Sequence, residues 1–80
     1  MLPVQSRMAR AALGWGVRDL AGAAKVSPDT IARLERGESL YARTVEAIRA
    51  ALEGAGIEFI AENGGGPGVR LKKSAPQSAA

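Results

Sequence analysis

Apolar residues between positions 16 and 37, in the stretch GVRDLAGAAKVSPDTIARLERG, recur at the spacing of two short helices joined by a tight turn. Leu20 and Ala21 fall on the inner face of the first helix. Ile31 and Leu34 fall on the inner face of the second, and Val26 lies between the two helices, where it closes a small core. The pattern predicts two packed helices, the arrangement that places one helix in the major groove of DNA in helix-turn-helix proteins.

Local signals fix both ends of the second helix. Ser27 is a suitable N-cap, because its hydroxyl can accept from an otherwise unpaired backbone N–H. Pro28 fits the first helical position, where no backbone donor is needed. Gly37 ends the helix, since glycine takes a left-handed conformation freely.

The same spacing places helices elsewhere in the first two thirds of the chain. We expect them over residues 5–13, 17–24, 28–36 and 42–54. The first has Met8, Ala12 and Leu13 as its inner stripe, and the last has Val45, Ile48 and Leu52. The turn Gly14-Trp15-Gly16 follows the first helix, and Gly16 is an acceptable N-cap for the second. We interpret Trp15 as a lid on the core rather than a platform for base stacking.

The period then changes from helical to alternating. Residues 57–60 and 69–72 are short, β-branched runs with Asn-Gly and further glycines between them, which predicts a β-hairpin. Residues 74–80 are small and polar, and we expect a disordered tail. The glycine run lacks a Gly-Lys-Ser/Thr ending and no helix follows it, so a phosphate-binding loop is disfavoured. The expected organisation is a helical domain over 1–56, a hairpin over 57–73 and a tail over 74–80.

Composition narrows the possible functions. The 80 residues carry 11 Lys and Arg against 8 Asp and Glu, a net charge of +3, and the excess of basic residues lies within residues 1–50. The chain has no Cys and no His, so we expect no disulfide, no His/Cys metal site, no histidine-based triad and no cofactor. We find no signal peptide or membrane span, and we expect a cytoplasmic protein associated with the nucleoid.

Residues 5–53 resemble the Cro and phage-repressor type of helix-turn-helix, the XRE family. The residues that carry the resemblance are Arg10, Leu13, Leu20, Ala21, Val26, Ser27, Thr30, Ile31, Leu34, Glu35 and Gly37. It implies a mainly α, lambda-repressor-like four-helix DNA-binding domain, here with a C-terminal β-hairpin, from a bacterium or phage. Three features depart from the family pattern: Val17 replaces the usual Gln, Lys25 replaces the usual Gly of the turn, and the hairpin replaces the fifth helix.

The resemblance also implies site residues. The candidates for contacts to base edges are Pro28, Asp29 and Arg33; those for contacts to phosphates are Arg18, Ser27, Thr30, Arg36 and Arg43. Arg10 and Glu35 match a structural salt bridge between the first and third helices. Alternatives remain open. Asp29 and Arg33 either act on DNA or form a solvated salt bridge, Thr30 bonds a phosphate or its own helix backbone, and Tyr41 packs under the last helix or offers its hydroxyl to a phosphate.

The expected function is a sequence-specific transcriptional regulator, a repressor that binds an inverted repeat in double-stranded DNA as a homodimer. An isolated hairpin is barely stable in water, so we expect the hairpin to mediate the dimer. Its candidate contacts are Ile57, Phe59, Ile60, Val69 and Leu71. The competing interpretation is that the hairpin only covers the core. The closest rival function is a module that binds a protein partner, such as an antitoxin that also binds DNA; an enzyme is a distant third.

Overall fold

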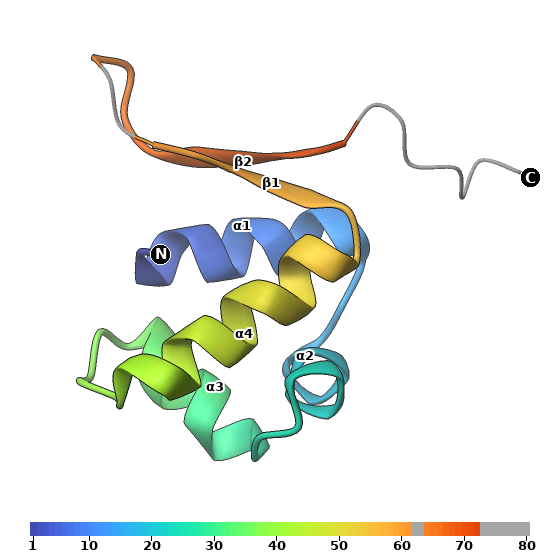
Figure 1. Ribbon diagram of the computed structural model, residues 1–80, viewed down its shortest axis with the longest axis vertical. Helices are drawn as coiled ribbons and strands as arrows, with labels where there is room; N and C mark the ends of the chain where they lie inside the picture. The colour runs from blue at the N-terminus through green and yellow to red at the C-terminus, as the bar shows by residue number, and fades with distance from the viewer. Residues whose placement is uncertain (62–63, 73–80) are drawn as a thin grey trace, which may run out of the picture.

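The computed structural model describes residues 1–61 and 64–72, which form four helices and a two-stranded antiparallel hairpin. The helices are α1 (Pro3–Leu13), α2 (Val17–Ala24), α3 (Pro28–Glu35) and α4 (Ala42–Gly54), and the strands are β1 (Ile57–Ile60) and β2 (Gly68–Leu71). The expected mainly helical fold with a C-terminal β-hairpin is confirmed. The hairpin lies across α1 on the side of the molecule away from α2 and α3 (Figure 1).

The α2–turn–α3 unit has the predicted end signals. The Ser27 hydroxyl accepts from the backbone N–H of Thr30 at 3.1 Å, so Ser27 is the N-cap of α3. Lys25 lies in the turn with φ = +59°, a left-handed conformation that costs a residue with a Cβ some free energy. Gly37 has φ = +88°. The helix α3 ends at Glu35, one residue earlier than predicted.

The core lies where the four helices and the hairpin meet. Its fully buried large side chains are Leu20, Ile31, Ile48, Leu52 and Ile57. They come from α2, α3, α4 and β1, so each of these elements contributes apolar area that is removed from water. Trp15 is half-buried against this cluster, as the interpretation of a core lid requires.

The inner face of α1 differs from the prediction. Its buried residues are Gln5, Ser6 and Ala9, whereas Ala12 is exposed and Met8 is only half-buried; of the predicted stripe, Leu13 does pack against the core. The helix also begins earlier, at Pro3, because Gln5 Oε1 accepts from the backbone N–H of Leu2 at 2.8 Å and proline fits the first turn. The prediction failed because the two polar residues are buried through hydrogen bonds to partners that are distant in sequence.

The hairpin is anchored to both neighbouring helices. Its strands pair with Ile57 opposite Leu71 and Phe59 opposite Val69. On α1, the Gln5 side-chain amide donates to the carbonyl oxygens of Ile60 and Gly68 at 3.3 and 3.0 Å. On α4, the Arg49 guanidinium lies 4.8 Å from the centre of the Phe59 ring. The hairpin therefore covers the core on the side formed by α1 and α4.

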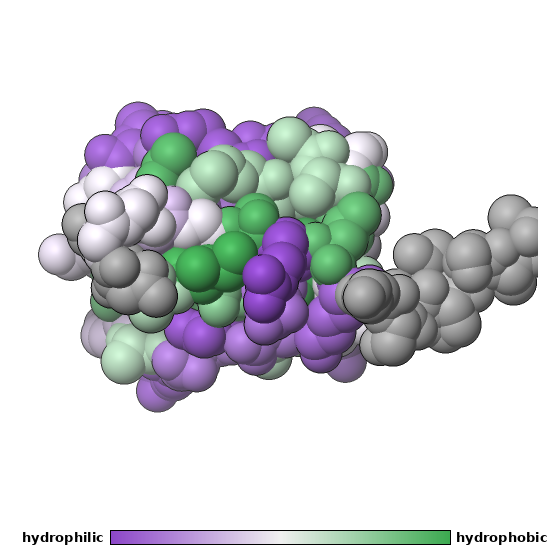
Figure 2. Space-filling view, turned by 90° about the horizontal axis from the view of Figure 1, so that it is seen from above, coloured by the Kyte–Doolittle hydropathy of each residue, from purple (hydrophilic) through white to green (hydrophobic). Residues whose placement is uncertain are grey.

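One candidate dimer residue is corrected by this packing. Ile57 has no exposed surface, so its side chain belongs to the core and faces no second chain. By contrast, Leu71 is 45% exposed. Figure 2, which views the molecule from the hairpin side, shows apolar patches interrupted by hydrophilic residues. The predicted tail, residues 74–80, lies outside the described residues. Among the residues described, no helix is long and apolar enough to cross a membrane.

Candidate nucleic-acid interface

The candidate contact residues lie on one helix and on the first turns of its two neighbours. Ser27, Pro28 and Asp29 are exposed at the start of α3, and Arg36 is exposed just after its end. Arg18 lies in the first turn of α2 and Arg43 in that of α4, and both are exposed. The structure thus places the proposed base contacts on α3 and leaves their surface open to solvent.

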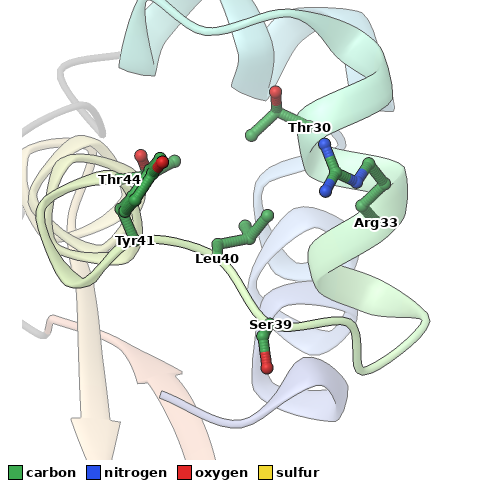
Figure 3. Close-up of a pocket in the computed structure, with 6 residues that line it drawn as sticks. All are labelled: Thr30, Arg33, Ser39, Leu40, Tyr41 and Thr44. Carbon is green, nitrogen blue, oxygen red and sulfur yellow. The ribbon is translucent and has the colours of Figure 1, made fainter.

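A hollow of about 570 Å³ separates α3 from the start of α4 (Figure 3). The residues that line it are Thr30, Arg33, Ser39, Leu40, Tyr41 and Thr44. The Arg33 guanidinium points from α3 toward this hollow, and Tyr41 and Thr44 lie on the opposite side (Figure 3). A guanidinium and several hydroxyls in an open hollow supply donors for an anionic ligand.

The contacts of Tyr41 and Thr30 exclude one of the two alternatives left open for each residue. Tyr41 is 74% exposed, so it does not pack under α4; its ring instead lies 5.2 Å from the guanidinium carbon of Arg43. The Thr30 hydroxyl lies 2.9 Å from the Ser27 hydroxyl, so it bonds the capping residue rather than its own helix backbone. The Ser27 and Thr30 hydroxyls therefore lie side by side at the start of α3, joined by a hydrogen bond.

The start of α4 is also suited to an anion. Tyr41 is the N-cap residue and makes no side-chain capping hydrogen bond, and the first turn contains no acidic residue. The N–H groups at the start of a helix have no partner within the helix and carry a partial positive charge. The guanidinium of Arg43 adds a full charge beside them.

The partner of Arg33 is not the residue that the helical spacing suggested. Arg33 Nε donates to Glu38 Oε1 at 3.1 Å, and Arg36 Nε donates to Glu38 Oε2 at 2.9 Å. These hydrogen bonds, that from Arg36 foremost, hold the pKa of Glu38 below its ordinary value. Asp29 makes no ion pair with any described residue. Of the two alternatives for Asp29 and Arg33, the solvated salt bridge between them is therefore not formed.

Sequence reasoning missed Glu38 because it lies beyond the end of the helix. Helical spacing relates residues three and four apart, whereas Arg33 and Glu38 are five apart. The signal that could have found the pair is Gly37, which is free to turn the chain back over the last turn of α3.

On its inner side, α3 is held by polar residues of α1. Arg10 donates to both carboxylate oxygens of Glu35, from Nε at 2.8 Å and from Nη2 at 2.7 Å, and Ser6 Oγ donates to Glu35 Oε2 at 2.7 Å. Arg7 Nη1 donates to the Glu35 carbonyl oxygen at 2.6 Å. Burial raises the pKa of Glu35, but the hydrogen bonds from Arg10 and Ser6 outweigh it, and the net pKa is lowered. The Glu35 hydrogen bond raises the pKa of Arg10.

No metal centre is formed by the described residues, in which no three His, Cys, Asp or Glu side chains gather closely enough to hold an ion. The arrangement is instead one of exposed cations and hydroxyls around a helix that is fixed on its inner side. This arrangement is suited to an extended anion, because Arg, Ser, Thr and Tyr side chains and helix N-termini are the groups that contact phosphate oxygens.

Residues 6–58, about two thirds of the chain, match the model of a protein family described as a helix-turn-helix domain. The matched region includes most of α1, all of α2, α3 and α4, and the beginning of β1. No curated protein matches the chain in sequence.

Proposed function

The chain belongs to the family of helix-turn-helix domains, and from this premise we propose that it is a sequence-specific DNA-binding transcriptional regulator of the Cro and phage-repressor type. It lays α3 in the major groove of double-stranded DNA in the nucleoid. Arg33 reads a base, and Pro28 and Asp29 lie beside it at the groove floor. Arg18, Arg36, Arg43 and the Ser27–Thr30 hydroxyls contact the phosphates on either side.

One observation carries this proposal. The exposed arginines and hydroxyls of three elements surround the outer side of α3, while the ion pair of Arg10 with Glu35 fixes the opposite side of the same helix. A recognition helix needs both properties, because base contacts require a fixed approach angle and phosphate contacts set the position of the protein on the duplex.

The test is a selection of duplexes from a random library with the wild-type protein, followed by titrations of the enriched duplex and of random DNA. We expect Arg33→Ala to weaken binding to the enriched duplex by about 1–3 kcal/mol and to affect random DNA little. We expect Arg43→Ala to weaken both alike and to lower the slope of log affinity against log salt by about one unit.

Arg70→Ala is the matched control, because Arg70 is an exposed arginine in an ion pair on β2, away from α3. It should change neither titration measurably. Equal weakening of the enriched and random duplexes by Arg33→Ala would show that Arg33 contacts no base. If the library yields no enriched sequence, the proposed function is wrong.

We also propose that the protein is a repressor that binds an inverted repeat as a homodimer, paired through the hairpin. Half-exposed apolar residues on the hairpin support it, and the candidates that remain are Phe59, Ile60, Val69 and Leu71. Two paired hairpins would hold two copies of α3 at the ~34 Å spacing of successive major grooves. Solution mass at tens of micromolar tests the dimer; Leu71→Glu should yield a folded monomer, and a wild-type monomer at about 10⁻⁵ M contradicts it.

A further inference from the structure

The end of α3 has a backbone geometry that brings residue 38 back over residue 33. The N–H of Glu38 donates to the Arg33 carbonyl oxygen at 3.0 Å, and the N–H of Gly37 donates to the Leu34 carbonyl oxygen at 3.0 Å. With Gly37 at φ = +88°, these two bonds form a Schellman motif. The residue after the glycine in this motif normally makes an apolar contact with the residue five before it. Here that contact is an ion pair between Glu38 and Arg33.

The atoms used in this ion pair leave the end of the arginine available. Glu38 accepts from Arg33 Nε, and among residues 1–61 and 64–72 neither terminal nitrogen, Nη1 or Nη2, takes part in a hydrogen bond. A guanidinium donates in pairs from a planar fork, so its terminal pair remains free for a bidentate contact to guanine O6 and N7. Arg36 occupies the other oxygen of Glu38, which fixes the carboxylate from its far side.

We propose that Glu38 is a positioning residue for specificity: it holds Arg33 by Nε with its terminal nitrogens directed away from α3, so that the arginine is ordered before DNA arrives. The inference rests on the proposed function, in which Arg33 reads a base. An unordered arginine loses rotamer freedom on binding, whereas one that is already held loses less. The Glu38 charge also opposes the approach of phosphates, but this repulsion weakens binding to every duplex alike and leaves the preference unchanged.

A change at Glu38 should alter the preference of the protein, which we define as the ratio of its affinity for the enriched duplex to its affinity for random DNA. Glu38→Gln keeps the shape of the side chain and removes the charge. We expect it to lower this ratio about 2- to 10-fold, the factor that corresponds to ordering one long side chain on binding. Affinity for random DNA should rise at the same time, because one negative charge near the phosphates is gone.

The experiment compares wild type, Glu38→Gln, Arg33→Ala and the double variant on the duplex that wild type enriches and on random DNA, at several salt concentrations. If Glu38 acts through Arg33, Glu38→Gln lowers the ratio in the wild type and leaves it unchanged in the Arg33→Ala background. Glu58→Gln is the matched control, because Glu58 is an exposed acid that accepts two hydrogen bonds from one arginine, on the hairpin. Thermal melting should show each variant folded.

Every outcome decides the inference. If Glu38→Gln raises both affinities by one common factor, Glu38 is only a competitor of phosphate and the inference is wrong. It is also wrong if the ratio falls equally with and without Arg33, or if Glu38→Gln behaves like Glu58→Gln. These results leave the proposed function standing, whereas failure of the wild-type protein to enrich any duplex overturns both.

Discussion

The helix α3 carries an arginine–glutamate cluster on each of two sides, and the two clusters differ in their exposure to water. On the inner side, the side chains of Arg10 and Glu35 are 20% and 9% exposed. On the outer side, those of Arg33 and Glu38 are 44% and 45% exposed. Exposed pairs are screened by water and salt and contribute little, whereas a half-buried, bidentate pair is costly to break. The same chemistry therefore supports the fold on one side of α3 and stays available to a ligand on the other.

Removal of the acid from the inner cluster should have the largest effect. Glu35→Ala leaves Arg10 half-buried without its partner and removes an acceptor of Ser6, so we expect the free energy of unfolding to fall by about 3 kcal/mol. For a domain of this size the Tm should fall by roughly 10 °C or more. Chemical and thermal unfolding of the free protein measure both quantities.

Glu38→Ala is the control in the outer cluster and should change the free energy of unfolding far less than Glu35→Ala does, because exposed ion pairs contribute little to stability. If the two variants are equally stable, the distinction between a supporting and an available cluster does not hold.

The pH dependence of stability should come mainly from the inner cluster. The net pKa of Glu35 is lowered in the folded protein from its ordinary value of 4.5, so its ionised form is favoured by folding. A lowered folded pKa contributes stability that is present above pH 4.5 and is lost as pH falls through the folded pKa. Below pH 4.5 the free energy of unfolding of Glu35→Gln should fall much less with pH than that of wild type. The free energy of unfolding of Glu38→Gln should fall nearly as much as that of wild type. Urea unfolding between pH 3 and pH 7 tests this, and an unchanged acid limb in Glu35→Gln contradicts it.

Salt should produce the smallest difference. At an ionic strength of about 1 M the Debye length is about 3 Å, so the exposed Glu38 pairs are screened. The small margin by which wild type exceeds Glu38→Gln in stability should vanish at this salt concentration. The excess over Glu35→Gln should largely persist, because the Arg10 pair is half-buried. If the difference in stability between wild type and Glu38→Gln does not change with salt, the Glu38 pairs support the fold in the same way as the Arg10–Glu35 pair.

The sequence predicted the bounds of α2 and α4 because end signals and apolar spacing agreed there. Val17 and Gly54 begin and end those helices as expected. The pattern failed on α1, where alanines on every side give no clear stripe and the buried positions are held by Gln5 and Ser6. A polar side chain is buried only when its partners are in place, and those partners lie 29 to 63 residues away in the chain. Local periodicity contains no information on such partners.

The candidate site was predictable in its residue types but not in its pairing. The resemblance made Arg33 a candidate and Arg33 lies on α3 as expected, but its partner Glu38 depends on the left-handed Gly37 and on a backbone bond that closes over the last turn. Asp29, one helical turn before Arg33, had the right spacing and no ion pair formed. Helical spacing relates residues within one helix, whereas Glu38 lies beyond the last residue of α3.

The hydrogen bonds from Gln5 to the carbonyl oxygens of Ile60 and Gly68 join the beginning of the chain to its later part, so they can form only after the hairpin has been synthesised. A ribosome makes chains from the N-terminus at about 5–20 residues per second. The residues of α1 are thus synthesised first, but the amide of Gln5 has no acceptor until the hairpin follows. These two hydrogen bonds between α1 and the hairpin are therefore the part of the native fold that cannot form before the chain reaches residue 68.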